Sequence, residues 1–181
     1  MPPDASIHRH VVKRLPALSD SQIRSLSDLL IDCVDGGASV GFMHPLPQAR
    51  AQAYWRGIAA AMLEGGRALL AAKDADGIAG AVQLILDQPE NQPHRADLSK
   101  MLVHRRARRR GLGAALLLAA ENLARDCGKS LLVLDTASAD AERLYTRLGW
   151  QRCGVIPGYA LWPRGGLCDT TYFYRTLTPH P

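Results

Sequence analysis

Residues 97–114 read DLSKMLVHRRARRRGLGA, and three patterns follow one another in this stretch. The first part partly alternates apolar and polar residues, as a half-buried strand does, and its apolar members are Leu98, Met101, Leu102 and Val103. An arginine cluster follows, and after it comes an apolar segment punctuated by Gly111 and Gly113. The stretch therefore predicts a strand, a turn and the N-terminus of a helix.

This turn is predicted to bind an anion. Glycine has no Cβ, so Gly111 and Gly113 allow the backbone to approach a ligand closely. The first N–H groups of a helix have no acceptor within the helix and point outward. The guanidinium groups of Arg108, Arg109 and Arg110 add positive charge in a shape that suits phosphate oxygens. A phosphate-bearing ligand fits these features.

The same arginine cluster leaves another interpretation open. Five arginines between residues 105 and 110 could form a solvated basic patch or a nucleic-acid contact, and the net charge of +5 is compatible with such a partner. Much of that excess lies in this one cluster, however, and the sequence shows no zinc-finger, RRM or helix-turn-helix signal. A polyanionic cofactor explains the concentration of charge equally well.

Length and composition indicate an ordinary globular protein. The chain has 181 residues, of which 47% are hydrophobic and 22% are charged, and we expect residues 1–181 to form a single domain. No segment is apolar enough to cross a bilayer, and residues 1–6 lack the apolar core of a signal peptide. A cytoplasmic location without membrane contact is therefore expected.

The cysteines do not suggest a metal site or disulfides. They stand singly in apolar surroundings and form no CxxC pair; they are Cys33, Cys127, Cys153 and Cys168. Reduced, buried thiols are the prediction.

Periodicity and turn residues predict an alternation of strands and helices. Strands are expected at residues 11–15, 67–73, 78–86, 94–104, 131–134, 151–156 and 170–177. Helices are expected at about 19–33, 47–64 and 111–127, with a fourth that carries residues 141–148 and stops at Gly149. On the third helix, four polar residues should face outward, namely Glu121, Asn122, Arg125 and Asp126.

Two connecting segments stand out. Residues 157–166 are expected to form a long loop that carries Tyr159 and Trp162, and loops of that length are uncommon without a function. The glycine-rich segment 36–43, with Ser39 and Phe42, lies between two helices and is either a simple connector or a substrate lid.

The spacing Arg108-x-x-Gly111-x-Gly113, directly after a strand, resembles the acetyl-CoA signature of the GNAT superfamily of N-acetyltransferases. The resemblance implies a mixed α/β (α+β) fold, with a central sheet of about six to seven strands flanked by about four helices. It also implies acetyl-CoA as the cofactor. Its pyrophosphate would lie on residues 108–113, that is on Arg108, Arg109, Arg110, Gly111, Leu112 and Gly113, and Ala114 would also contact the cofactor. Its pantetheine arm would run along the strand edge at Met101, Leu102 and Val103.

A second motif lies between residues 138 and 150. It resembles the GNAT pattern Asn-x-x-Ala-x-x-Leu-Tyr-x-x-x-Gly-Phe, in which Ala141, Leu144, Tyr145 and Gly149 match. Ser138 stands in place of Asn, and Trp150 in place of Phe. Tyr145 is either a core tyrosine or the acid that returns a proton to the leaving thiolate, and the family pattern favours the acid, which would also contact the cofactor.

Shorter pieces resemble the tabtoxin-resistance branch of the superfamily: residues 36–43, 97–113, 135–136 and 157–159. By this resemblance Asp135 is the base that takes the amine proton, and Asp97 occupies the other acidic position. We expect Asp135 to be buried at the end of an apolar strand. From the residues alone, Asp135 could instead cap a helix, and Asp97 could be a surface charge on a strand. The acceptor would contact Ser39, Phe42, Asp97, Asp135 and Tyr159.

These observations together predict an N-acetyltransferase that moves an acetyl group directly from acetyl-CoA to the amine of a small molecule, such as an amino-acid-like compound, a toxin or an antibiotic. A catalytically idle CoA-binding protein and a basic nucleic-acid-binding domain are the alternatives. We expect a monomer or a homodimer.

Overall fold

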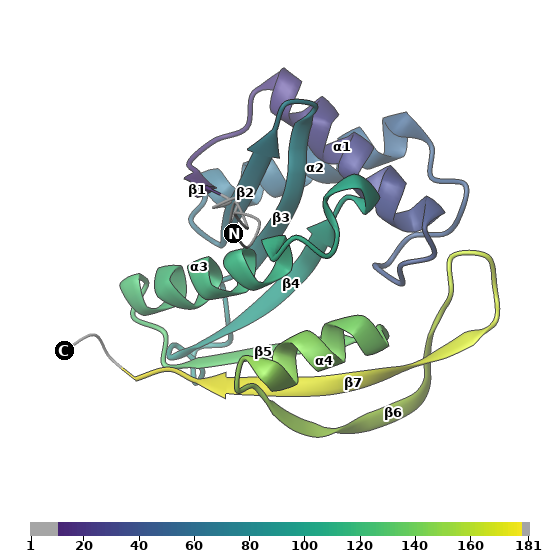
Figure 1. Cartoon of the computed structure of the whole chain (residues 1–181). Coiled ribbons are helices and arrows are strands. Elements are labelled where there is room, and N and C mark those ends of the chain that lie inside the picture. Colours follow the sequence, from purple (N-terminus) through teal and green to yellow (C-terminus); the bar gives the residue numbers. More distant parts are fainter. Residues whose placement is uncertain (1–10, 179–181) are drawn as a thin grey trace, which may run out of the picture.

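The computed structural model describes residues 11–178 (Figure 1). The strands are β1 (Val12–Leu15), β2 (Arg67–Asp74), β3 (Gly77–Ile85), β4 (Arg95–Val103), β5 (Leu131–Thr136), β6 (Gln151–Leu161) and β7 (Leu167–Thr176). The helices are α1 (Asp20–Asp35), α2 (Gln48–Leu63), α3 (Leu112–Asp126) and α4 (Ala139–Arg147), and a short 3₁₀ turn covers Arg105–Ala107.

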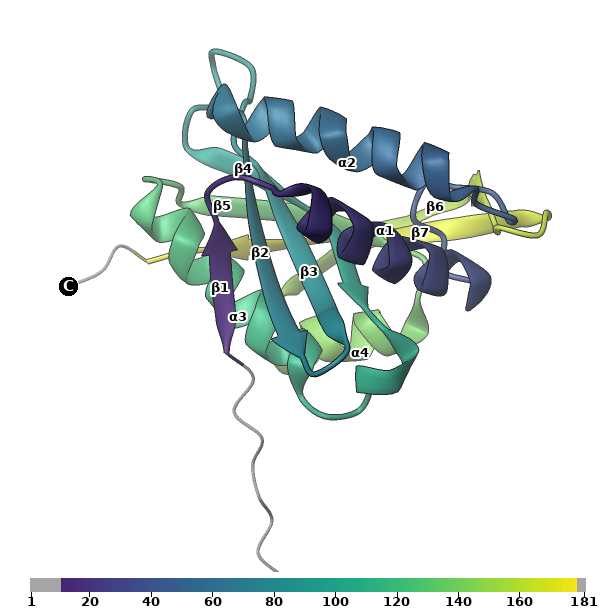
Figure 2. The same cartoon turned by 90° about the horizontal axis from the view of Figure 1, so that it is seen from above.

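The strands form one mixed sheet in the order β1-β2-β3-β4-β5-β7-β6. Only β4 and β5 pair in parallel within the described residues; every other neighbouring pair is antiparallel. Helices α1 and α2 cover one face of the sheet, and α3 and α4 cover the other (Figure 2). The mixed α/β fold expected from the sequence is confirmed.

Each face of the sheet has its own hydrophobic core. Successive residues of β2 point to opposite faces, so Leu70 packs with α3 while Leu69 packs with α1 and α2.

Helix α1 begins with a capping box, in which the Ser19 side chain accepts from the Gln22 backbone N–H and the Gln22 side chain accepts from the Ser19 backbone N–H. No helix in residues 11–178 is long and apolar enough to cross a membrane.

The expectation that residues 157–166 form a long loop is wrong. Strand β6 continues to Leu161, β7 begins at Leu167, and only residues 162–166 turn the chain. Pairing breaks between Ile156 and Ala160, at Pro157 and Gly158, and then resumes. Proline lacks an N–H and Gly158 has φ +59°, so this dipeptide marks a bulge within a strand rather than a loop.

Two other expectations also need correction. Glu121 was expected to face outward, but it is buried, and its carboxylate is satisfied there by a 2.9 Å hydrogen bond from Nε1 of Trp150. All four cysteines are free, as predicted, but Cys153 is exposed on the outer strand β6, whereas Cys33 and Cys168 are buried.

Candidate active site

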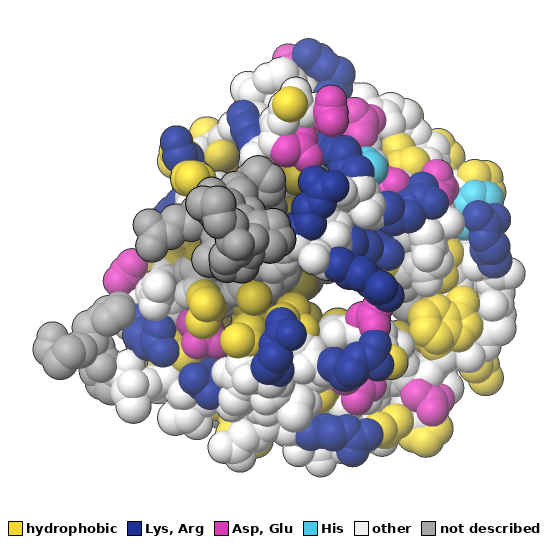
Figure 3. All heavy atoms as spheres, in the orientation of Figure 1, with side chains coloured by type: hydrophobic (Ala, Val, Ile, Leu, Met, Phe, Trp, Pro, Cys, Tyr) yellow, Lys and Arg dark blue, Asp and Glu magenta, His cyan; other side chains and the backbone are white. Residues whose placement is uncertain are grey.

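The parallel strands β4 and β5 separate in the middle of the sheet. They pair only from Arg95–Leu131 to Asp97–Val133, although β4 continues to Val103 and β5 to Thr136. Among residues 11–178, the edge of β4 that faces β5 therefore has no strand partner beyond Asp97. Figure 3 shows the molecule hollowed between these strands, with Lys and Arg side chains gathered along the border. An extended ligand chain could pair with this free edge.

A bulge in β4 turns the strand beside the opening. Ser99 pairs with Gln83 and Leu102 with Ala81, so two residues of β4, Lys100 and Met101, lie opposite one residue of β3. Lys100 has φ +49°, in the left-handed region. Bulges of this kind re-aim a strand and are frequent next to active sites. Of the three predicted pantetheine contacts, Leu102 is buried, so only its backbone is free to contact a ligand.

Two of the five arginines in the cluster hold the turn in place. Arg105 donates from Nε and from its backbone N to the carboxylate of Asp32, at 2.8 and 2.9 Å. Arg106 donates to both carboxylate oxygens of Asp74, at 2.9 and 3.0 Å. Burial alone would raise the pKa of Asp32, but the hydrogen bonds from Arg105 and the nearby positive charges hold it below its usual value. These ion pairs offset two of the positive charges on which the nucleic-acid interpretation depends.

The start of α3 has the geometry of an anion site. Gly111 is the N-cap residue with φ +80°, and no side chain of the described part of the chain caps the helix, so its first N–H groups are not satisfied by a cap. A Cβ at Gly111 would meet nothing within 4 Å, so glycine is required there by the backbone angle. A Cβ at Gly113 would lie 3.1 Å from Leu144 Cδ2, so glycine there allows α3 and α4 to pack closely. These residues fit a pyrophosphate.

The other predicted cofactor contacts around the turn differ in their surroundings. Arg109 has φ +61° and is exposed, while Arg108 Nε donates to the Val103 carbonyl at 3.1 Å. The Leu112 side chain is buried, so this residue, like Ala114, offers its backbone N–H. Ser138 is the N-cap of α4, where its hydroxyl accepts from the Ala141 N–H at 3.3 Å. The alternative that Asp135 caps this helix is therefore wrong.

Tyr145 lies in the aromatic core between α4 and the sheet. Its ring centroid is 5.8 Å from that of Trp150 and 5.7 Å from that of Phe173. Burial, and then the negative charge of Asp135, raise the pKa of the Tyr145 hydroxyl. Within residues 11–178 nothing hydrogen-bonds that hydroxyl. A tyrosine in this setting stays protonated at neutral pH.

Asp135 and Asp97 lie on the same face of the sheet, since Asp97 pairs with Val133, two residues before Asp135. Asp135 accepts a 2.7 Å hydrogen bond from Thr170 Oγ1. The expectation that Asp135 is buried is wrong: it is exposed, because β5 extends past its last pair with β4. Asp97 is half-buried and accepts from Arg95 Nη1 and, at 3.2 Å, from Gln88 Nε2.

Two tyrosines adjoin these carboxylates. Tyr172 lies directly opposite Asp135 on β7, and its hydroxyl is 3.2 Å from the hydroxyl of Tyr159. The hydrogen bond with Tyr159, followed by burial and the charges of Asp135 and Asp97, raises the pKa of Tyr172 to about 12. Tyr159 was expected at the acceptor site, whereas Tyr172 was missed because nothing in its local sequence sets it apart.

Comparison with known proteins identifies the family. Residues 26–150 match the model of the acetyltransferase (GNAT) family. The chain belongs to this family. It is therefore an acyltransferase by family, which confirms the class of enzyme that the motifs predicted.

Individual relatives agree with this membership. An uncharacterized N-acetyltransferase from Azospirillum brasilense, encoded in the hisH-hisA intergenic region, is 29% identical over 163 residues, which cover 87% of this chain and 95% of the relative. A putative acetyltransferase, yncA of Salmonella typhimurium, solved with acetyl-CoA, shares the fold with a TM-score of 0.75 at 19% identity, over 95% of this chain and 96% of that one. A phosphinothricin acetyltransferase of Sinorhizobium meliloti, in complex with acetyl-CoA, has a TM-score of 0.74 at 18% identity, over 93% of this chain and 88% of that one.

In this GNAT family member the loop between α1 and α2 is fastened to the β6–β7 hairpin, and Figure 1 shows the two side by side. Ser39 Oγ donates to the Leu161 carbonyl at 3.3 Å, and the His44 N–H donates to the Pro163 carbonyl at 2.8 Å. The ring of Phe42 meets that of Tyr54 edge-on, with centroids 5.2 Å apart. The loop therefore connects α1 and α2 to the β6–β7 hairpin, and Ser39 contributes to that connection.

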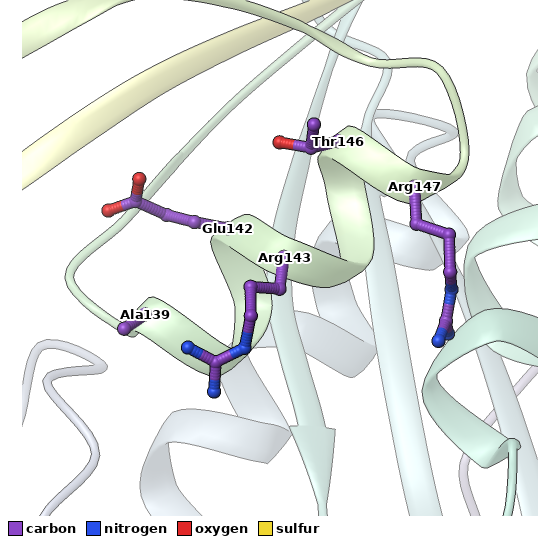
Figure 4. A pocket seen from close by; sticks show the side chains of 5 residues that line it. All are labelled: Ala139, Glu142, Arg143, Thr146 and Arg147. Atoms are coloured by element: carbon purple, nitrogen blue, oxygen red, sulfur yellow. The ribbon is translucent and has the colours of Figure 1, made fainter.

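Helix α4 also borders a shallow depression of about 520 Å³ on its outer side, lined by Ala139, Glu142, Arg143, Thr146 and Arg147 (Figure 4). Glu142 accepts from Thr171 Oγ1 at 2.9 Å, and Arg143 pairs with Asp140. Since both side chains are engaged within the protein, this depression is a less suitable site than the opening between β4 and β5.

Proposed function

We propose that this GNAT family member is an N-acetyltransferase that transfers an acetyl group directly to the amine of a small molecule. Acetyl-CoA is the donor and supplies an acetyl group activated as a thioester. One observation carries the proposal: the opening between β4 and β5 has an anion site at one end, the start of α3, and two carboxylates at the other, Asp97 and Asp135. Cofactor and amine can thus approach each other from opposite sides of the sheet.

The cofactor side is formed mainly by backbone. The N–H groups at the start of α3, together with Arg108, Arg109 and Arg110, bind the pyrophosphate. The free edge of β4 at residues 101–103 pairs with the amide groups of the pantetheine arm. A backbone N–H of the same edge donates to the thioester carbonyl and stabilises the negative charge that develops on its oxygen.

Asp135 and Tyr145 move the protons. An amine must lose a proton before it attacks, and Asp135 Oδ1 is available because Thr170 engages Oδ2. Tyr145, kept protonated by its raised pKa, gives the proton of its hydroxyl to the departing thiolate. Asp97, whose carboxylate is held in position by Arg95 and Gln88, attracts the cationic amine.

The acceptor in this proposal is a small amine of the amino-acid, toxin or antibiotic kind, as in the tabtoxin-resistance branch. The solved phosphinothricin acetyltransferase of similar fold supports an acceptor of this size. We also propose that residues 1–181 form one domain that acts in the cytoplasm.

A screen of amines, with free-thiol release as the readout, tests the proposal. We expect turnover of at least one class of amine and, in Tyr145→Phe, a kcat lower by roughly 10²-fold with little change in cofactor affinity. Tyr174→Phe, at a half-buried tyrosine of β7, removes a hydroxyl elsewhere on the sheet and serves as the control. Binding of acetyl-CoA without turnover of any amine would contradict the proposal and favour an idle CoA-binding protein.

A further inference from the structure

Lys100 lies on β4 close to Asp97 and Asp135, which form the proposed acceptor region, and its ammonium group has no hydrogen-bonding partner within residues 11–178. Its Nζ lies 5.9 Å from the centroid of the Tyr54 ring on α2, and 3.5 Å from the position that a Cβ would take at Gly41. Among residues 11–178 no oxygen accepts a hydrogen bond from Nζ and no carboxylate lies within ion-pair distance. The group is therefore half-buried between the bulge of β4, α2 and the loop that carries Phe42.

This arrangement is unfavourable for the protein alone. A partly buried ammonium group loses hydration that a cation–π contact replaces only in part. Burial, and then the positive charge of Arg67, lower the pKa of Lys100, while the charge of Asp135 opposes the shift. An anion bound beside Nζ would compensate the lost hydration of the ammonium group.

The surrounding side chains extend the positive end of the site. Arg67 Nη1 donates to Gln83 Oε1 at 3.1 Å, and Gln83 Nε2 donates to the Tyr54 hydroxyl at 3.0 Å. This chain of hydrogen bonds fixes Tyr54 beneath Lys100 and keeps a second cation nearby. Asp97 lies on β4 before the bulge, and Asp135 lies on the neighbouring strand β5, opposite Tyr172 of β7.

The acceptor region thus offers positive charge at one end and negative charge at the other. A ligand with several amines and no acidic group would bring a cation close to Lys100, which costs free energy at such short range. A ligand that carries both an ammonium and a carboxylate matches the two ends.

We propose that Lys100 binds the carboxylate of the acceptor, and that the substrate is an α-amino acid or a compound that keeps both groups of one, rather than a polyamine or an aminoglycoside. This inference rests on the proposed N-acetyltransferase function, and it assigns Lys100 to acceptor recognition, with Tyr54 and Gln83 as positioning residues.

Matched acceptors test the inference. The panel consists of the protein amino acids and the corresponding amino-acid amides, which differ only in the charge of the carboxyl group. For the wild type we expect kcat/KM to be at least about 10-fold higher for the acid of a pair. In Lys100→Met, which keeps the length of the side chain, that ratio should fall by about 10- to 100-fold, mainly through KM of the acid. Lys73→Met, at the exposed end of β2, is the control and should keep the wild-type ratio.

A binding experiment separates this inference from the proposed reaction. Calorimetry with N-acetylated amino acids and their amides, added to the CoA complex, measures their binding affinity in the absence of turnover. If the acids bind more tightly than the amides and this preference depends on Lys100, the inference is supported, even where no amine is acetylated. The lack of acetylation would then contradict only the proposed reaction. Turnover of amines with equal kcat/KM for acids and amides, or equal losses for both in Lys100→Met, would overturn the inference and leave the proposed reaction standing.

Discussion

Nε1 of Trp150 donates a 2.9 Å hydrogen bond to Oε1 of Glu121, and both side chains are buried. The other oxygen of Glu121 lies 3.8 Å from Arg125 Nη2 and from Arg175 Nε, which compensate its charge. Because the Trp150 ring also packs against Tyr145, this pair connects α3 to the residue proposed as the acid.

Removal of the Glu121 carboxylate should destabilise the protein strongly. Glu121→Leu leaves the indole N–H and two guanidinium groups without their partner, and we expect the free energy of unfolding to fall by about 3 kcal/mol. Glu121→Gln keeps an acceptor for Trp150 and removes only the charge, so roughly half that loss is expected. Denaturant unfolding followed by tryptophan fluorescence measures both values. Equal losses in the two variants would show that the hydrogen bond to Trp150 contributes nothing.

The turn before α3 should make the protein sensitive to acetyl-CoA. A ligand at a hundred times its Kd adds about 2.7 kcal/mol to the free energy of unfolding, which gives a clear thermal shift. Gly111→Val should abolish that shift, because a β-branched residue strongly disfavours φ +80° and would distort the anion site.

A second glycine provides the control for this experiment. Gly128 has φ +72° just past the far end of α3, and its Cβ position, like that of Gly111, is open. Gly128→Val therefore introduces similar backbone strain away from the turn before α3. It should lower the melting temperature of the free protein and leave the full shift by acetyl-CoA in place. A normal acetyl-CoA shift in Gly111→Val would refute the assignment of this turn.

Asp32 should contribute to stability at neutral pH and not in acid. Its pKa is lower in the folded protein than in the unfolded chain, so the unfolded chain binds more protons near pH 4. The contribution is present above that pH and is lost as the pH falls through the lowered pKa. Asp32→Asn should thus reduce the free energy of unfolding by about 1–2 kcal/mol at pH 7, and the difference from the wild type should shrink below about pH 4.

The measurement for Asp32 is a series of denaturant titrations between pH 3 and pH 7. Glu90→Gln, at an exposed carboxylate between β3 and β4, should remain close to the wild type throughout. A deficit in Asp32→Asn that stays constant with pH would mean that its charge does not matter.

Local features of the sequence predicted much of the fold and the turn before α3. Gly111 was identifiable because a turn before a helix has its own residue requirements, which the structure meets with φ +80°. Lys100, Tyr172 and the burial of Glu121 depend on contacts between distant elements, and no pattern of neighbouring residues reports them. Pro157 and Gly158 were interpreted as part of a loop, because the sequence does not distinguish a turn from a bulge after which pairing with the neighbouring strand resumes.

Substitutions of Asp135 and of Asp97 should affect different kinetic constants. Asp135→Asn keeps the shape and the hydrogen bond with Thr170 while it removes the charge, so kcat should fall and the acidic limb of the pH–rate profile should flatten. Asp97→Asn weakens the attraction for a cationic amine and disturbs the pair with Arg95, so the acceptor KM should rise with a smaller change in kcat. Steady-state kinetics over a range of pH, with the acceptor found in the amine screen, measure both effects. The reverse pattern would exchange the two roles. Unchanged kinetics in both variants would mean that the amine proton leaves through a water chain or through the substrate itself, because β4 and β5 carry no other carboxylate.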